Sequence, residues 1–255
     1  MYAEERQQAI SSLVNQRTRV SVTDLADHFG VTTETVRRDL AVLERIGVVR
    51  RVHGGAVPAS ALTAIEPATT EREFAHADQK DRIAKSALEF LPGPGGSVLF
   101  DAGTSTGRIA ALLPTDRELT VVTNSVPIAA RVSGLNSVHL HMLGGRVRGL
   151  TQAAVGPEAL RVLSTLRVDV AFIGTNALSV GHGLSTPDSD EAEVKRAMLD
   201  AAQQIVVVAD SSKIGREHMI SFGSADRVDV LVTDSGISDA ARGELRNCGM
   251  EVVVA

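Results

Sequence analysis

The chain has 255 residues, a net charge of −5 and one cysteine, Cys248. No apolar stretch approaches the roughly 20 residues of a membrane-spanning helix, and residues 1–6 lack the basic and apolar regions of a secretory signal. A single cysteine excludes an intrachain disulfide and a cysteine-rich zinc site. We therefore expect a cytoplasmic protein that carries no metal or cofactor and does not associate with a membrane.

Charge is distributed unevenly along the chain. Residues 1–55 hold eight arginines against seven acidic residues, whereas residues 56–255 hold 18 basic against 24 acidic residues. The overall acidity argues against a protein that coats nucleic acid without sequence preference. A nearly neutral module with clustered arginines, joined to an acidic body, favours local docking on DNA.

The first 46 residues have the periodicity of three short helices. We place them at 3–16, at 33–46 and, between these two, from Ser21 to Gly30. Ser21 caps the second helix, and Asp24 is spaced to reach back in a capping box. Two helices joined by a tight glycine turn are typical of a helix-turn-helix.

The third helix has an apolar back and a basic front. Val36, Leu40 and Leu43 fall at i, i+4 and i+7 and face the core, whereas Arg38 lies on the opposite side. Such a helix fits a recognition helix in the major groove of DNA. The side chains that we expect at the DNA are Thr32, which also caps the helix, Thr33, Thr35, Arg37, Arg38 and Arg45.

A wing hairpin follows the third helix. Two short β stretches flank Arg50 and Arg51, which we expect at backbone phosphates, and Gly54-Gly55 ends the module. Taken singly, an arginine pair on a helix usually marks a solvated surface, and His53 is more often structural than functional. The order of the elements favours a winged helix-turn-helix.

This module resembles the helix-turn-helix of DeoR-type transcriptional regulators. The resemblance rests on Arg6-x3-Ile10-x3-Val14, on Thr32-x2-Thr35-Val36-Arg37-Arg38-Asp39-Leu40, and on Leu43, Gly47 and Arg51–Ala56 beyond them. Val36 replaces the usual isoleucine and Thr32 the common serine, and both changes are mild. The resemblance implies binding to double-stranded operator DNA.

A linker separates this module from a second domain. Residues 56–70 contain Pro58 and Pro67 and show no apolar period, and a helix at 77–91 then stops at Pro92–Gly96. We assign residues 1–57 to a winged helix-turn-helix domain, 58–76 to a linker and 77–255 to an α/β domain.

Short apolar β runs alternate with helices from residue 97 onward. Most runs are continuously apolar, as in strands covered on both faces, so we predict a doubly wound, Rossmann-like α/β domain with a largely parallel sheet. The predicted strands are 97–101, 119–123, 138–143, 168–174, 204–210, 228–234 and 251–254, and the predicted helices are 105–113, 125–133, 156–166, 190–202 and 238–247.

Glycine, hydroxyl and amide residues follow successive strands, and the strand ends of a parallel sheet share one edge, where ligands bind. Gly103–Gly107 opens a helix whose N–H groups favour an anion, and Lys213 supplies a charge for phosphate. Taken singly, such a loop is as often only a helix cap, and it lacks the ending of a nucleotide P-loop. We predict a small phosphorylated sugar, bound by Asp101, Gly103, Thr104, Ser105, Thr106, Thr123, Asn124, Gly144, Gly145, Glu191, Glu193 and Lys213.

Six segments of this region resemble the DeoR-type sensor domain, which is similar in fold to ribose-5-phosphate isomerase. They are Asp101–Thr106, Val121–Ser125, Leu143–Gly145, Gly183–Pro187, Glu191–Lys195 and Ala209–Lys213. The resemblance implies a repressor of sugar-catabolism or sugar-transport genes that leaves DNA when a phosphorylated intermediate binds. It also implies a homodimer or homotetramer.

Two alternatives stay open: an active isomerase with a DNA-binding appendage, and a structural DNA-binding protein without a ligand. Aldose–ketose isomerisation needs a carboxylate base, but Ile173–Ala177, the counterpart of the isomerases' acid-rich turn, contains no acid. Glu191 and Glu193 remain as candidate bases. The polar strand ends argue against a protein without a ligand, and we expect a regulator rather than an enzyme.

Overall fold

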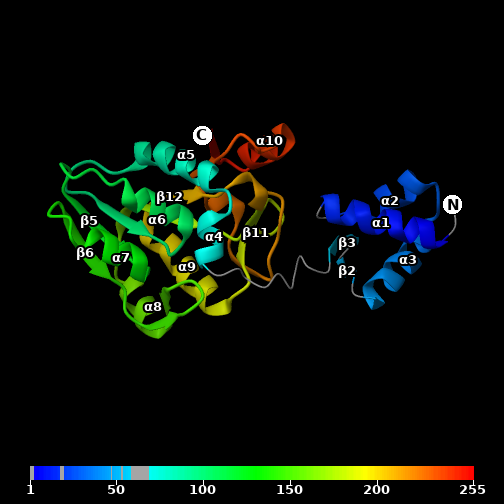
Figure 1. Cartoon of the computed structure of the whole chain (residues 1–255), viewed down its shortest axis with the longest axis horizontal. Helices are drawn as coiled ribbons and strands as arrows, with labels where there is room; N and C mark the ends of the chain where they lie inside the picture. Colours follow the sequence, from blue (N-terminus) through cyan, green and yellow to red (C-terminus); the bar gives the residue numbers. More distant parts are fainter. Residues whose placement is uncertain (1–2, 18–19, 47, 53, 59–68) are drawn as a thin grey trace. The chain divides into compact units, whose positions relative to one another are not determined.

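The computed structural model describes residues 3–17, 20–46, 48–52, 54–58 and 69–255. The chain divides into two compact units, Met1–Ile65 and Glu66–Ala255 (Figure 1). None of the described helices is both long and apolar enough to cross a bilayer.

The first unit consists of three helices and a three-stranded antiparallel sheet of order β1-β3-β2. Its elements are α1 (Ala3–Arg17), β1 (Val20–Ser21), α2 (Val22–Phe29), α3 (Thr33–Arg45), β2 (Val49–Val52) and β3 (Gly55–Pro58). Val36, Leu40 and Leu43 of α3 pack with Ile10 and Val14 of α1 in a buried core. The three predicted helices and the apolar back of the third are confirmed.

Turn chemistry explains where α2 begins and ends. Ser21 Oγ accepts a hydrogen bond from Asp24 N at 3.0 Å, which satisfies one of the free N–H groups of the first turn. Gly30 adopts a left-handed conformation with φ 63° and ends the helix. The chain then needs only two residues before α3 starts at Thr33.

The wing differs from the prediction in one respect. Arg50 and Arg51 do not lie between two strands but within β2, which pairs with β3. A turn that contains Gly54, at φ 76°, joins the two strands. The prediction was wrong because the valines on both sides of the arginines belong to one strand, whose side chains alternate between two faces. His53 lies outside the described residues.

A seven-stranded sheet of order β15-β14-β12-β9-β4-β5-β6 forms the centre of the second unit, and every neighbouring pair is parallel. The strand order reverses between β4 and β9, and this switch point is where ligands bind in such sheets. The strands are β4 (Ser97–Phe100), β5 (Leu119–Thr123), β6 (Val138–Met142), β9 (Val168–Gly174), β12 (Ala202–Val208), β14 (Val230–Thr233) and β15 (Glu251–Val254). All seven predicted strands are present.

Helices cover both faces of the sheet, which confirms the doubly wound α/β fold (Figure 1). One buried core includes the stacked rings of Phe100 and Phe172, whose centroids lie 5.3 Å apart. That core joins the sheet to α5 (Ala77–Ala87), α6 (Thr104–Ala111) and α7 (Val126–Val132). The core on the opposite face joins it to α8 (Pro157–Leu163), α9 (Ser189–Ala201) and α10 (Asp239–Asn247).

Several short elements have no counterpart in the prediction. They are the hairpin of β7 (Arg146–Arg148) and β8 (Ala153–Val155), the small antiparallel sheet of β10 (Ala177–Ser179), β11 (Gly183–Thr186) and β13 (Ile220–Gly223), the 3-10 turns Ser211–Lys213 and Ala225–Arg227, and helix α4 (Thr69–Phe74). The 3-10 turn Leu88–Phe90, by contrast, follows α5 within the predicted helix at 77–91. α4 lies inside residues 58–76, the predicted linker. Each element is too short to show a hydrophobic period.

Candidate functional site

The exposed face of α3 carries basic side chains that were predicted to meet DNA. The side chains of Arg37 and Arg38 are 61% and 80% exposed, and each guanidinium lies 3.7 Å from a carboxylate oxygen of Glu34. Exposed ion pairs of this kind contribute little, so both groups can exchange Glu34 for a phosphate or a base. Thr32 Oγ1 accepts a hydrogen bond from Thr35 N at 3.2 Å and lies 2.9 Å from Thr35 Oγ1, so these hydroxyls cap the helix.

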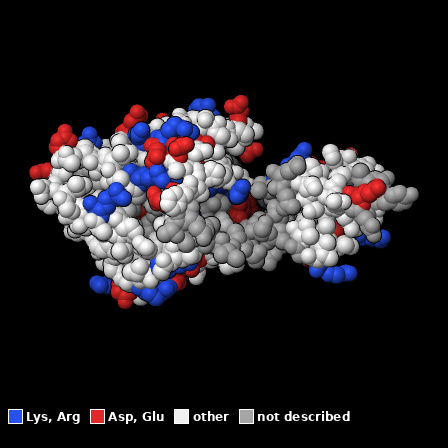
Figure 2. Space-filling model, in the orientation of Figure 1, with Lys and Arg blue, Asp and Glu red and all other residues white. Residues whose placement is uncertain are grey.

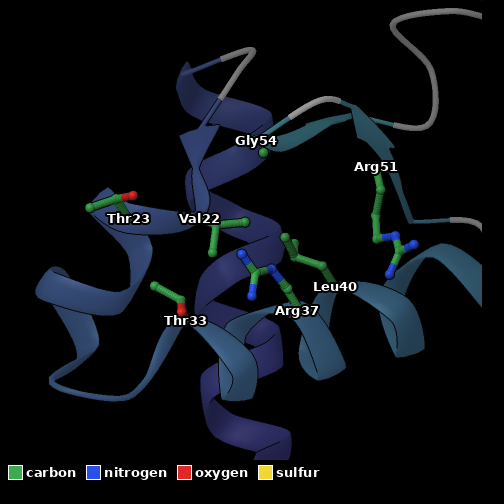
Figure 3. Close-up of a pocket in the computed structure, with 8 residues that line it drawn as sticks. Val22, Thr23, Thr33, Arg37, Leu40, Arg51 and Gly54 are labelled. Carbon is green, nitrogen blue, oxygen red and sulfur yellow. The ribbon is translucent and has the colours of Figure 1, made fainter.

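A cavity of about 490 Å³ lies between α3, the start of α2 and the wing (Figure 3). Three of the predicted DNA contacts, Thr33, Arg37 and Arg51, line it, and Arg37 extends from α3 toward Val22. Arg45 is exposed at the end of α3, and the side chain of Arg50 lies outside the described residues. The other lining residues are Val22, Thr23, Leu40, Gly54 and Gly55, which are not among the predicted DNA contacts.

Two acidic residues hold this surface in place. Asp39 is a buried residue of α3, and its Oδ2 accepts a hydrogen bond from Arg6 Nε at 2.6 Å while its Oδ1 accepts one from Gln7 Nε2 at 2.9 Å. Glu44 accepts a hydrogen bond from the Arg51 backbone N at 2.9 Å and contacts Arg51 Nε at 3.2 Å. These contacts tie α3 to α1 on one side and to the wing on the other.

A polar pocket lies at the switch point of the second unit. It is formed by the segments after β4, β9 and β12, by two side chains of α9 and by Arg72 of α4. Six of the predicted ligand residues meet there: Gly103, Thr104, Ser105, Thr106, Glu191 and Lys213. Ala102, Gly174, Thr175, Asn176, Lys195 and Val208 complete the lining with Arg72.

Three basic side chains, Arg72, Lys195 and Lys213, and one acidic side chain, Glu191, line this pocket. Basic and acidic side chains are interspersed over the visible face of the second unit (Figure 2). Lys213 Nζ donates to Thr175 O at 2.9 Å. Burial lowers the pKa of Lys213 to about 8, the Asp210 carboxylate opposes that shift, and the charge of Arg72 adds to it. A buried cation that other cations surround favours an anionic ligand.

Asp101 does not line the pocket but bonds to two residues that do, Gly174 and Lys195. Its carboxylate accepts hydrogen bonds from Lys195 Nζ and, at 3.0 Å, from Gly174 N. Burial raises the pKa of the Asp101 carboxyl, and the charge of Lys195 acts in the opposite direction. Lys195 Nζ also donates to Gly174 O at 3.0 Å, so Asp101 positions the lysine that lines the pocket.

The start of α6 presents two hydroxyls with different surroundings. Thr106 Oγ1 donates to Asp101 O at 2.7 Å and also lies 3.0 Å from Gly103 O. These contacts close the turn. The Ser105 side chain is 5% exposed, and its Oγ has no hydrogen-bond partner among the described residues. An unpaired buried hydroxyl is costly, so Ser105 Oγ is a vacant partner for a ligand atom.

The other predicted ligand residues lie outside the pocket lining or serve the scaffold. Thr123 Oγ1 donates to Phe100 O at 2.7 Å, and Asn124 Oδ1 accepts from Ala102 N at 3.0 Å, so both connect strand ends. Gly144 and Gly145 are exposed beside the β7–β8 hairpin. Gly145 has φ 128°, and a Cβ there would lie 2.5 Å from Val155 O, which explains the glycine without a ligand.

The structure distinguishes the two glutamates of α9. Glu191 is buried in the pocket wall, where Oε1 accepts hydrogen bonds from Arg148 Nη1 at 2.6 Å and from Thr151 Oγ1. Glu193 is exposed and does not line the pocket. Lys195 was not assigned as a ligand, although it lies four residues after Glu191 and therefore on the same helix face. Arg72 was missed because its segment was assigned to the linker.

No group of three or more His, Cys, Asp or Glu side chains in the described part of the chain is arranged to hold a metal ion. The pocket lining offers ammonium, guanidinium, hydroxyl, amide and backbone N–H groups, together with the carboxylate of Glu191. The donors among these groups recognise phosphate through charge and hydrogen bonds.

Comparison with known proteins covers both units. Residues 6–61 match the DeoR-like helix-turn-helix domain, and residues 75–235 match the DeoR C terminal sensor domain. The HTH-type transcriptional regulator GlpR of Haloferax volcanii is 38% identical over 253 residues, which are 99% of this chain and 98% of that protein. The glycerol-3-phosphate regulon repressor of Escherichia coli K12 is 30% identical over 231 residues, which are 91% of this chain and 90% of that protein. Ribose 5-phosphate isomerase A of Methanocaldococcus jannaschii aligns over 55% of each chain with a TM-score of 0.41 and 16% identity.

Proposed function

Because the chain belongs to the DeoR family of transcriptional regulators, we propose that it represses genes of sugar catabolism or sugar transport in the cytoplasm and that a phosphorylated sugar releases it from DNA. The first unit binds operator DNA, and the second unit binds the effector. The relatives named above are regulators, and the proposal extends their activity to this chain.

The DNA contacts follow from the exposed face of the first unit. α3 lies in the major groove, where Arg38 reaches base edges or phosphates, and Arg37 and Thr33 contact the duplex beside it. Arg51 of the wing contacts the sugar–phosphate backbone. Thr32, Thr35, Arg45 and Arg50 are the remaining DNA contacts that we propose.

One observation carries the effector class: a buried hydroxyl, Ser105 Oγ, without a partner among the described residues faces a pocket that also holds Lys195 and Lys213. Two ammonium groups and the start of α6 fit a phosphate. Glu191, in the same wall, accepts hydrogen bonds from sugar hydroxyls. A small phosphorylated sugar or polyol supplies both kinds of group.

One relative supports this class of ligand. The Escherichia coli protein is named as the repressor of the glycerol-3-phosphate regulon. Glycerol 3-phosphate combines a phosphate with hydroxyls in a small molecule, which is the combination that the pocket residues match. We therefore place small phosphorylated polyols and sugars first among the candidates.

The two activities are linked through an oligomer. In a homodimer or homotetramer, two DNA-binding units contact two half-sites whose spacing must match. Effector binding changes the placement of these units and lowers the affinity for DNA, as linkage between two sites requires.

A thermal-shift screen tests the effector class. Glycerol 3-phosphate, ribose 5-phosphate and fructose 1-phosphate are each compared with the unphosphorylated parent, because a ligand of the native state raises its stability. We expect at least one phosphorylated compound to raise the Tm in a saturable manner and its parent to have no effect. Silence across a broad panel of phosphates, or stabilisation by a parent compound alone, contradicts the proposal.

A further inference from the structure

We propose that Arg72 binds the anionic group of the effector, and that helix α4, which carries Arg72, transmits occupancy of the pocket to the chain segment that leads to the DNA-binding unit. This inference rests on the proposed function and deepens it. It assigns a ligand residue and a route for the signal to α4, which lies inside the predicted linker.

The first observation is the position of Arg72. Arg72 lines the same pocket as Lys195, Lys213 and Ser105, whose hydroxyl has no hydrogen-bond partner in the described part of the chain, and Arg72 is half-buried. Its charge also helps to lower the pKa of Lys213, which places the two cations within electrostatic reach of each other. A guanidinium forms paired hydrogen bonds with a phosphate, so an incoming phosphate relieves the repulsion between these cations.

The second observation is that two cations, the buried Lys80 and the partly exposed Arg108, hold the end of α4. Lys80 is 3% exposed, and its Nζ donates to Arg72 O and, at 2.6 Å, to Ala75 O. Arg108 Nη2 donates to Glu73 O at 2.9 Å and contacts Glu73 Oε1 at 3.3 Å. A helix of six residues is not stable alone in water. α4 therefore depends on a charge cluster that adjoins the pocket. The charge of a bound ligand acts directly on this cluster.

The third observation is that α4 lines two neighbouring cavities. Arg72 lines the anion pocket, whereas Thr69 and Glu73 line a second cavity of about 140 Å³. Gly103 and Thr104 belong to both linings, so the two cavities meet at the start of α6. The anion pocket itself is small, about 20 Å³, so a phosphorylated ligand would occupy the two adjoining cavities together and contact α4 in both.

α4 is also the part of the pocket nearest in sequence to the first unit. Its first residue, Thr69, donates from N at 3.1 Å and from Oγ1 at 2.9 Å to Leu150 O, which anchors the helix at that end. The other lining residues begin at Ala102. A rearrangement of α4 is therefore passed to the preceding segment, which joins the DNA-binding unit.

A single tryptophan on α4 tests this inference. The chain contains no tryptophan, and Phe74 is 83% exposed and lines neither cavity, so Phe74→Trp in the full-length protein reports on α4 alone. Inorganic phosphate is the probe, and its binding is followed by tryptophan emission and by thermal stability in parallel. We expect both signals to saturate at the same phosphate concentration.

Substitutions of Arg72 in the Phe74→Trp background separate the two parts of the inference. Arg72→Gln should weaken phosphate binding by about tenfold or more and abolish the emission change, and Arg72→Lys should retain part of both. Arg82→Gln on α5, an exposed arginine outside both cavities, is the matched control and should change neither signal. Far-UV circular dichroism confirms that each variant is folded.

Three results contradict the inference, and they are distinguishable. Saturable stabilisation by phosphate without an emission change removes the role of α4. Unchanged phosphate affinity in Arg72→Gln removes Arg72 as a ligand, and Arg72→Met, which also lacks the charge, gives the same test if Arg72→Gln does not fold. No phosphate binding to the wild-type chain removes the proposed anion site and this inference, whereas the thermal-shift screen of phosphorylated compounds tests the proposed function separately.

Discussion

Lys195 and Asp101 form an ion pair beside the pocket, and their side chains are only 5% and 2% exposed. The pair joins the end of β4 to α9 across 94 residues of sequence. Because Lys195 also lines the pocket, the same contact supports the fold and positions a cation for the effector.

Removing one partner of this ion pair should destabilise the second unit. Lys195→Met leaves the Asp101 carboxylate buried without its cation, and we expect a loss of about 3–5 kcal/mol in the free energy of unfolding, measured with urea at neutral pH. The double variant Asp101→Asn/Lys195→Met removes the uncompensated charge and should recover most of that loss. A single variant as stable as the wild type would contradict the assigned pair.

Ser105 and Thr106 should respond in opposite ways to loss of their hydroxyls. Ser105→Ala removes a buried hydroxyl that has no partner among the described residues, so we expect unchanged or slightly increased stability and an effector affinity weaker by about 1 kcal/mol. Thr106→Val breaks the hydrogen bonding to Asp101 O and Gly103 O and should cost about 1–3 kcal/mol of stability. Urea unfolding and calorimetric titration measure both quantities. Unchanged effector affinity in Ser105→Ala would show that this hydroxyl does not contact the ligand.

Effector affinity should fall in mildly alkaline solution. Lys213, with a pKa of about 8, is positively charged at neutral pH and loses its proton as the pH rises. A phosphate monoester keeps its double charge there, because its second pKa is about 6. We expect the Kd to rise on the order of tenfold between about pH 7.5 and about pH 9.5 in calorimetric titrations.

Lys213→Arg is the control for this pH dependence, because a guanidinium keeps its charge throughout that range. Burial also lowers the pKa of Lys80, whose ammonium donates to Arg72 O of α4 and to Ala75 O just after it. Burial lowers the pKa of His218 as well, so that imidazole is neutral in this range. The Lys213→Arg variant should therefore have a nearly flat profile. If it keeps the full pH dependence, Lys213 is not the titrating group.

Arg38→Ala should separate DNA binding from effector binding. The Arg38 side chain is the more exposed of the two adjacent arginines on α3, and loss of a base contact costs about 1–3 kcal/mol. Fluorescence anisotropy with a DNA fragment selected by the wild-type protein measures this loss, and calorimetry should show unchanged effector binding. Arg82→Ala on α5 is the control for lost surface charge. Wild-type DNA affinity in Arg38→Ala would remove this residue from the interface.

Much of the fold was predictable because it depends on local patterns. The continuous apolar runs of the central sheet identify parallel strands with both faces covered, and Val36, Leu40 and Leu43 mark the buried side of α3. α4 was not predictable, because six residues carry no period and its stability depends on Lys80 and Arg108 from elsewhere in the sequence.

The pocket was predictable only in outline. The rule that ligands bind at strand ends located Gly103–Thr106 and Lys213, but it does not distinguish a side chain that faces the ligand from one that holds the scaffold. Asn124 comes after strand β5, and Ser105 comes after strand β4. The side-chain amide of Asn124, however, is held by hydrogen bonds with Ala102 N and Ala154 O. Such assignments depend on tertiary hydrogen bonds, which the sequence does not reveal.

The most direct test of the account is the release of DNA by the effector. The wild-type protein and Lys213→Ala are bound to the same selected DNA fragment, and the phosphorylated compound identified by thermal shift is added while anisotropy is recorded. We predict that the wild-type affinity for DNA falls by about 5- to 150-fold, as is typical of coupled sites, and that Lys213→Ala stays bound. A wild-type protein that binds effector and DNA together without loss of affinity would contradict the account.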